Sequence, residues 1–260
     1  MGLTSGIIRA LNAFFAVNRK VCRRLEVFLP QAKTSIFDQY IQTVTGVVNG
    51  RPRNAVVIDV GGGKRCPFAH SLKGAGHATI IAVDISEDEL RHNNDVNGKL
   101  VADIVQRLPF RSRTVDLITS SSVLEHIQDV RRFVIHSSEV LKPDGYCVHL
   151  FPSKFAPFAL LNQLLKGVSR AVVHFFLPES KGICGFPAVY NECYYSAIRN
   201  LLLNNGFELI EVKPSYYQSP YFDFCFPLFA VSAAYEVVVK LLGLRNLAAY
   251  LLVVARRMGA

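Results

Sequence analysis

Short apolar runs alternate with helix-like segments through most of the chain. Seven runs are rich in β-branched and other apolar residues, and several of them end in a glycine turn or an acidic residue. Strands that alternate with helices indicate a parallel sheet covered by helices on both faces. The predicted strands are residues 55–60, 79–83, 100–102, 115–119, 146–151, 207–213 and 247–255.

Capping residues predict where helices begin between these runs. Ser86 with Glu89 forms a capping box, in which the serine oxygen accepts a hydrogen bond from a main-chain N–H of the first turn. Asp129 is expected to cap a helix that runs to about residue 142, and Asn191 one over 192–204.

The first 52 residues follow a helical period. Apolar residues recur at spacings of three, four and seven and are accompanied by a cluster of basic residues. Pro30 should end this first helix, and Ser35 should begin a second one. The apolar positions are Ile8, Leu11, Phe15, Cys22, Leu25 and Leu29, and the basic ones Arg9, Arg19, Lys20, Arg23 and Arg24.

Composition narrows the class of protein. The chain has 260 residues, which fits one large domain, and half of them are hydrophobic. A formal net charge of +9 favours an anionic partner, either nucleic acid or a membrane surface. The six cysteines form no metal or redox spacing, so reduced, mostly buried thiols are expected. The longest apolar run near the C-terminus, between Asp223 and Glu236, is too short for a membrane span.

The apolar run over residues 55–60 ends in Gly61-Gly62-Gly63, ahead of an expected helix. Glycines in such a turn let the backbone approach a ligand, and a helix N-terminus favours a carboxylate or phosphate. A dinucleotide fingerprint would require glycine where Cys66 stands, and a phosphate-binding P-loop would require a Lys-Ser/Thr pair that is absent. Both classes are therefore excluded.

Acidic residues end the next two predicted strands. Asp84 follows the second strand, where a carboxylate can accept hydrogen bonds from both hydroxyls of a ribose. Asp103 follows the third, where it can accept from an adenine amino group while Ile85 and Ile104 flank the ring. Taken singly, each acid also fits a structural role, as a helix cap or a solvated loop residue.

The successive motifs V-I-D-V-G-G-G, V-D-I-S, A-D-I with L-P-F, V-D-L-I with V-L-E-H-I, and L-K-P-D-G-Y resemble class I S-adenosylmethionine-dependent methyltransferases. The resemblance is to the small-molecule and lipid type, which includes the ubiquinone and menaquinone methyltransferases, and it covers residues 55–151 well. It implies a doubly wound, Rossmann-like α/β fold, a seven-stranded mixed sheet whose last strand is antiparallel, and S-adenosyl-L-methionine as the cofactor. Arg65 departs from the family, because many members carry a third alternating glycine there. The implied cofactor-binding residues are Asp59, Gly61, Gly63, Asp84, Ile85, Asp103, Ile104 and Ser120.

The segment after the fourth strand carries the candidate chemistry. His126 is the histidine that the motif places near the methyl group, so it is a candidate general base, with a purely structural role as the alternative. Some related O-methyltransferases bind a metal with an acid three positions before the Glu-His pair; Ser122 stands there, so no metal is expected. The residues 120–123 also lack the Asn/Asp-Pro-Pro-Tyr/Phe motif of amino-methylating nucleic-acid enzymes, which argues against a nucleic-acid substrate.

We therefore divide the chain into an N-terminal amphipathic segment, 1–52, and a methyltransferase domain, 53–260, with apolar insertions at 152–190 and 218–246. Both insertions begin at the carboxyl ends of strands, where ligands bind in such sheets. The sequence of the first insertion predicts a helix with one apolar stripe. In the second insertion, Glu236 is expected to form an ion pair with Lys240. The stripe is Leu160, Leu161, Leu164, Leu165 and Val168, opposed by Asn162, Gln163, Lys166 and Arg170.

These features predict a lipophilic acceptor and peripheral association of a cytoplasmic protein with an anionic membrane surface. Two alternatives remain open from sequence. The apolar segments could pack together as a lid or dimer contact of a soluble enzyme, or the chain could be a membrane-attached accessory protein that binds the cofactor without turnover.

Overall fold

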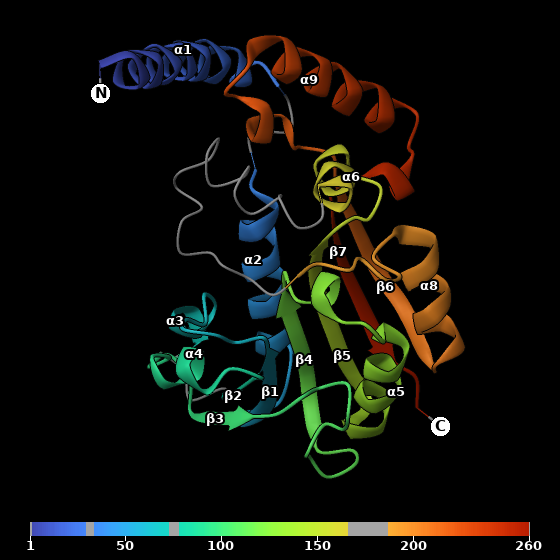
Figure 1. The fold of residues 1–260 in the computed structure, drawn as a ribbon. Helices are drawn as coiled ribbons and strands as arrows, with labels where there is room; N and C mark the ends of the chain where they lie inside the picture. Colours follow the sequence, from blue (N-terminus) through green and yellow to red (C-terminus); the bar gives the residue numbers. More distant parts are fainter. Residues whose placement is uncertain (1, 30–33, 73–77, 166–186, 260) are drawn as a thin grey trace.

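The computed structural model describes residues 2–29, 34–72, 78–165 and 187–259. Its centre is a seven-stranded sheet in the order β3-β2-β1-β4-β5-β7-β6, in which β7 runs antiparallel to both of its neighbours (Figure 1). The mixed sheet expected from the sequence is thus confirmed. The strands are β1 (Ala55–Val60), β2 (Ala78–Asp84), β3 (Gly98–Val101), β4 (Val115–Ser121), β5 (Leu141–Pro152), β6 (Phe207–Ser215) and β7 (Tyr250–Arg257).

Helices cover both faces of the sheet because the central strands are apolar on both sides. Val57 of β1 packs with α2 on one face, whereas its neighbour Ile58 belongs to the core beneath α5 and α8 on the other. The helices are α1 (Gly2–Glu26), α2 (Ile36–Asn49), α3 (Ala69–Leu72), α4 (Glu87–Arg91), α5 (Val130–Val140), α6 (Pro157–Leu164), α8 (Tyr195–Asn204) and α9 (Phe226–Leu241), with the short 3₁₀ helices η3 (Leu124–His126), η5 (Ser219–Phe222) and η6 (Arg245–Leu247).

Three of the predicted helix caps are present. Ser35 accepts a hydrogen bond from the N–H of Phe37, Ser86 from Glu89, and Asp129 from Arg132. The predicted cap at Asn191 is wrong. The helix begins only at Tyr195, and the side-chain oxygen of Asn246, far along the chain, accepts from the N–H of Ser196 at 2.9 Å.

A helical cover lies over the carboxyl end of the sheet. In Figure 1, α1 and α9 lie at the top of the molecule and α6 lies between them and the strands. The N-terminal segment joins α9 through Asn18, whose side-chain oxygen accepts from the N–H of Phe226 at 2.8 Å, and through an ion pair between Arg19 and Asp223 at 3.4 Å. We call α1, α6 and α9 the helical cover.

Two expectations for the helical cover are wrong, and some lie outside the described residues. Glu236 forms no pair with Lys240: its carboxylate is buried and accepts from the N–H groups of Gln218 and Ser219. The first helix ends at Glu26 rather than at Pro30. Outside the described part lie the side chain of Ile8 and the residues Pro30, Lys166, Val168, Arg170 and Cys184.

Candidate functional site

The glycine turn after β1 is held against the next strand. The N–H of Gly61 donates to the carbonyl of Val83 at 2.7 Å, and Gly61 and Gly63 have positive φ angles of 67° and 38°. A Cβ on Gly62 would lie 2.7 Å from the Cβ of Ala82, so only glycine allows this close approach. A Cβ on Gly63 would meet nothing closer than 3.8 Å, which leaves the outer side of the turn open.

Two residues missed by the sequence analysis close this turn. The buried Asn93 donates from Nδ2 to the carbonyl of Gly62 at 2.8 Å, and Asp95 accepts from the N–H of Cys66 at 3.1 Å. Arg65, at the position of the usual third glycine, points its exposed guanidinium toward Asp95 at 4.0 Å. The expected helix does not follow the turn directly, since α3 begins at Ala69. Long-range polar contacts therefore replace the third glycine.

Asp84 lies beside the glycine turn. One carboxylate oxygen accepts from the N–H of Gly63 at 3.1 Å and the other from the N–H of Ser86 at 2.9 Å. Each oxygen keeps further acceptor capacity for a ligand hydroxyl. Ile85, the next residue, is 56% exposed, so an apolar side chain is free to contact a ring next to this carboxylate.

Asp103 follows β3, the strand next to β2, and its side chain is half-buried. One of its carboxylate oxygens accepts from the N–H of Val105 at 3.0 Å. Ile104 is buried in the core below it. Because β3 and β2 are adjacent, Asp103 and Asp84 leave the same edge of the sheet. The sequence-predicted pair of carboxylates is therefore brought to one edge.

Two polar residues that were predicted to bind the cofactor, Asp59 and Ser120, also have inward-facing side chains. Asp59 is buried and accepts a hydrogen bond from the Cys66 thiol; burial raises the pKa of its carboxyl to about 7. The buried Ser120 hydroxyl lies 2.8 Å from Nδ1 of His149, a ring whose pKa burial lowers to about 4. Both side chains support the turn and the sheet, and their contact with the cofactor rests on the family resemblance alone.

Glu125 and His126 form the 3₁₀ turn beyond β4. The side chain of Glu125 is buried, and burial raises the pKa of its carboxyl to about 8. Its Oε1 lies 3.8 Å from Nε2 of the partly exposed His126, and its Oε2 has no hydrogen-bond partner in the part of the chain that the structure describes. The sequence motif indicates the histidine as the candidate base and not the carboxyl group, because nothing in a motif reports which side chain is buried.

The residues at this edge fit S-adenosylmethionine. An open glycine turn, carboxylates on two adjacent strands and the exposed Ile85 offer a close backbone approach, hydroxyl and amino acceptors, and an apolar ring contact. When bound, the cofactor supplies an electrophilic methyl group on a sulfonium. The protein groups at the turn would hold and orient it.

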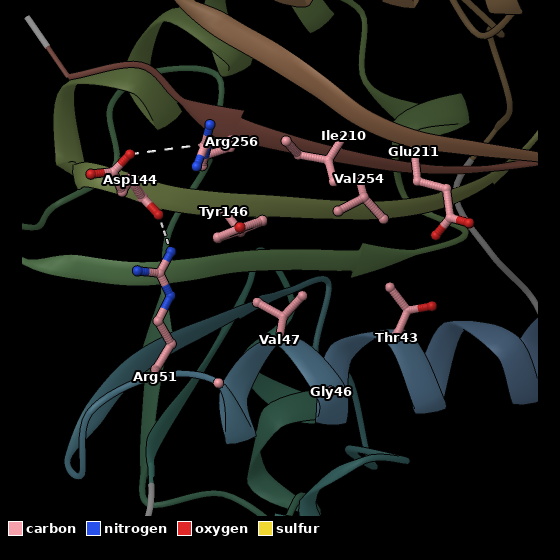
Figure 2. Close-up of a pocket in the computed structure, with 11 residues that line it drawn as sticks. Thr43, Gly46, Val47, Arg51, Asp144, Tyr146, Ile210, Glu211, Val254 and Arg256 are labelled. Carbon is pink, nitrogen blue, oxygen red and sulfur yellow. Dashed lines mark hydrogen bonds and ion pairs between the residues drawn. The ribbon is translucent and has the colours of Figure 1, made fainter.

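A cavity of about 480 Å³ lies elsewhere, between α2 and the β5–β7–β6 part of the sheet (Figure 2). In Figure 2 Arg51 and Arg256 both reach Asp144, at the start of β5. That is the opposite end of the parallel strands from the glycine turn, so this cavity is separate from the candidate site. Within the described residues there is no cluster of three potential metal-ligating side chains, and no helix there has the length and apolar character needed to cross a membrane.

Comparison with known proteins agrees with this geometry. A family model described as "Methyltransferase domain" matches residues 16–212. No curated protein sequence matches the chain.

Solved structures of similar fold include methyltransferases of small molecules. Geranyl diphosphate C-methyltransferase from Streptomyces coelicolor, solved with S-adenosyl-L-homocysteine, is 12% identical with a TM-score of 0.56, over 85% of this chain and 76% of that one. Phosphoethanolamine N-methyltransferase 2 from Haemonchus contortus, solved with S-adenosyl-L-methionine, is 13% identical with a TM-score of 0.54, over 85% of this chain and 53% of that one. An S-adenosylmethionine-dependent methyltransferase from Mesorhizobium loti is 18% identical with a TM-score of 0.53, over 84% and 98%.

These likenesses show the fold, and the family match covers well over half of the chain. The chain belongs to the methyltransferase domain family and is an S-adenosylmethionine-dependent methyltransferase.

Proposed function

We propose that the enzyme methylates a lipophilic small-molecule acceptor that it takes from an anionic membrane surface, with the helical cover resting on that surface. In this proposal Asp84 binds the ribose and Asp103 the adenine of the cofactor, with the glycine turn beneath its methionine end. The orientation of α6 is the observation that carries the membrane part.

The polar side chains of α6 face the protein and its leucines face outward. Asn162 donates to the Tyr190 hydroxyl at 3.3 Å, and Gln163 donates to the carbonyl of Lys154 at 3.0 Å. Leu160, Leu161 and Leu164 are 42%, 45% and 83% exposed. A helix packed in water normally has the reverse orientation. An outward leucine face therefore favours an apolar surrounding.

The α9 helix repeats this arrangement. Its one acidic side chain, Glu236, is buried, whereas Val231, Val238 and Leu241 are more than half exposed. Exposed apolar side chains in such numbers on neighbouring elements mark an interaction surface. Ser232, a polar residue, is buried instead.

The α1 helix adds positive charge to the apolar surface. Phe14 and Val17 are more than half exposed, and its last turn carries the exposed Arg23 and Arg24. Phe28, just beyond the helix, is 80% exposed. Exposed apolar groups beside arginines suit the boundary between acyl chains and anionic headgroups.

The second candidate is a soluble enzyme whose helical cover is a dimer contact. The same exposed leucines and valines support it, because a homodimer interface is also apolar. It predicts a concentration-dependent dimer and no affinity for lipid.

Flotation with vesicles separates the two candidates. The wild-type protein should float with vesicles of phosphatidylcholine and phosphatidylglycerol, less with phosphatidylcholine alone, and less at high salt. The double variant Leu164→Ser/Leu241→Ser should remain in the soluble fraction. Point substitutions are preferable to deleting residues 1–29, because Asn18 supports α9.

Matched controls test whether position matters. Ile210→Ser changes an exposed apolar side chain on β6, away from the helical cover, and should leave flotation unchanged. Arg23→Gln/Arg24→Gln should weaken binding to anionic vesicles, whereas Arg107→Gln/Arg111→Gln, also exposed, should not. Wild-type protein that never floats, but dimerises through Leu164 and Leu241, would establish the second candidate. Release of S-adenosylhomocysteine with a lipid extract, absent without it, would exclude an accessory protein without turnover.

A further inference from the structure

Glu125 is a buried acid with an unused hydrogen-bonding atom. Its side chain is 5% exposed, and Oε2 has no hydrogen-bond partner among the described residues, although nearly all buried polar atoms in proteins have one. The main-chain carbonyl of the same residue accepts two hydrogen bonds, from the N–H groups of Val189 and Tyr190 at 2.7 and 3.0 Å. The residue is therefore fixed in place while one carboxyl oxygen is left over.

Glu125 lies between the glycine turn after β1 and the tyrosines below the helical cover. Two residues earlier, Val123 packs so closely on the glycine turn that a Cβ on Gly61 would lie 2.3 Å from its Cγ2. On the other side, the charge of Glu125 acts on the hydroxyls of Tyr221 and Tyr250, which lie 2.5 Å apart below the helical cover. Phe158 of α6 stacks on both of these tyrosine rings.

We propose that Glu125 accepts the proton of a hydroxyl group on the methyl acceptor, and that His126 passes this proton to solvent. The acceptor is then an alcohol or phenol, and the enzyme an O-methyltransferase. The lipophilic character of that acceptor rests on the proposed function; the role of Glu125 rests on its own position and on the methyltransferase activity.

Methyl transfer to the hydroxyl releases one proton, which Glu125 takes up. The hydroxyl oxygen forms a bond to the methyl carbon while the bond between that carbon and sulfur breaks, and its electron pair remains on sulfur as a neutral thioether. The hydroxyl proton goes to Oε2 of Glu125, which changes from carboxylate to carboxylic acid. His126, whose Nε2 lies 3.8 Å from Oε1 and whose ring is 26% exposed, connects the carboxyl to solvent.

Among the described residues, His126 is the basic side chain nearest to the Glu125 carboxyl, and Lys154 acts on the neighbouring Cys193 thiol. Tyr190, Tyr221 and Tyr250 face it, and burial raises the pKa of each hydroxyl, so all three are neutral. Cys193 is also nearby and buried, and desolvation raises the pKa of its thiol. With a pKa of about 8, the carboxyl is mostly protonated at about pH 7 before the cofactor binds. The sulfonium of bound S-adenosylmethionine would place a positive charge near Glu125. An opposite charge within a few ångströms lowers a carboxyl pKa by ~1–3 units.

This charge dependence gives a test that needs no acceptor. Isothermal titration in two buffers of different ionisation enthalpy, at about pH 7, counts the protons released on binding. S-adenosylmethionine should release about half a proton or more per site beyond S-adenosylhomocysteine, which lacks the positive charge. Glu125→Gln should bind both ligands without this difference. Glu87→Gln, an exposed acid on α4, should behave as wild type.

Equal proton release by the two ligands in the wild type, or an unchanged difference in Glu125→Gln, would overturn the proposal. A second measurement follows tritiated methyl transfer into a lipid extract between about pH 6 and 9. The wild-type kcat/KM for S-adenosylmethionine, which reports the cofactor-free enzyme, should rise through an apparent pKa near 8 and reach a plateau, and Glu125→Gln should lose at least tenfold in rate together with this rise. His126→Gln should keep the proton release on cofactor binding but turn over more slowly. Failure to float on vesicles with the proton release intact would reject the membrane proposal and leave Glu125 assigned.

Discussion

The glycine-turn edge and the helical cover differ in which side chains they expose: the first exposes acidic side chains, and the second exposes apolar ones. At the turn, the carboxylates of Asp84 and Asp103 remain near the surface, and main-chain N–H groups hold them in position. In the helical cover, Glu236 and Asn18 are buried as structural acceptors, and leucines and valines lie outside. This contrast supports our proposal that the first region binds the charged, water-soluble cofactor and that the second contacts an apolar surrounding.

Glu125 lies where these two regions meet, and its removal should have the largest effect on stability. Burial raises the pKa of its carboxyl from 4.5 in the unfolded chain to about 8. The folded state therefore holds the extra proton between these values, and the free energy of unfolding falls as the pH rises from about 4.5 to 8. Glu125→Gln should match wild type at about pH 5 and be more stable, by up to about 4 kcal/mol, at about pH 9. Thermal melts of both proteins across this range check the prediction, and a parallel pH dependence in the two would contradict it.

At the turn, Asp84→Ala should give the next largest effect, on cofactor affinity. A hydrogen bond to a charged acceptor contributes ~1.5–3 kcal/mol, so loss of the proposed ribose contact should weaken binding at least tenfold. Asp88→Ala on α4, whose side chain is 87% exposed, is the control. Titration calorimetry of both variants would dismiss the Asp84 assignment if their affinities were equal.

Substitutions of the adjacent Gly62 and Gly63 distinguish the energetic cost of close packing from the cost of a positive φ angle. Gly62→Ala places a Cβ 2.7 Å from Ala82 of the sheet, and such overpacking should lower the free energy of unfolding by ~1–3 kcal/mol and weaken cofactor binding. Gly63→Ala meets open space and should lose only ~1 kcal/mol, from its positive φ. Denaturant unfolding in which Gly63→Ala is the worse variant would show that the turn is limited by backbone conformation instead.

The smallest effect is expected in the helical cover. Asn18→Ala removes the acceptor for the N–H of Phe226 at the start of α9, a capping contact worth ~1 kcal/mol. Hydrogen exchange at the first turn of α9 should increase, while cofactor affinity stays unchanged. An equal change in exchange at the glycine turn would mean that the two regions are coupled.

The sequence predicted what depends on neighbours in the chain. The seven strands, the caps at Ser35, Ser86 and Asp129, and the two acids at the sheet edge follow from local periodicity, capping chemistry and family motifs.

The sequence failed where a distant residue decides the structure. Asn246 satisfies the start of α8 in place of Asn191, and Asn93 and Asp95 close the turn that lacks its third glycine. The four-residue spacing of Glu236 to Lys240 predicts a surface ion pair, but the buried carboxylate of Glu236 instead accepts from the main-chain N–H groups of Gln218 and Ser219, where η5 begins. No pattern along the sequence reports that α6 presents its leucines outward.

The place of β7 in the sheet has a consequence for how the chain folds. Residue 146 pairs with residue 256, and β6 joins the sheet only through β7. The first five strands can assemble from pairings between segments closer along the chain, but the apolar edge of β5 stays open until β7 arrives. Contacts between such distant residues slow folding, and an uncovered strand edge invites aggregation. We therefore expect the docking of β7 to be the slow phase of refolding, and the recovery of active protein to be most sensitive to concentration during that phase.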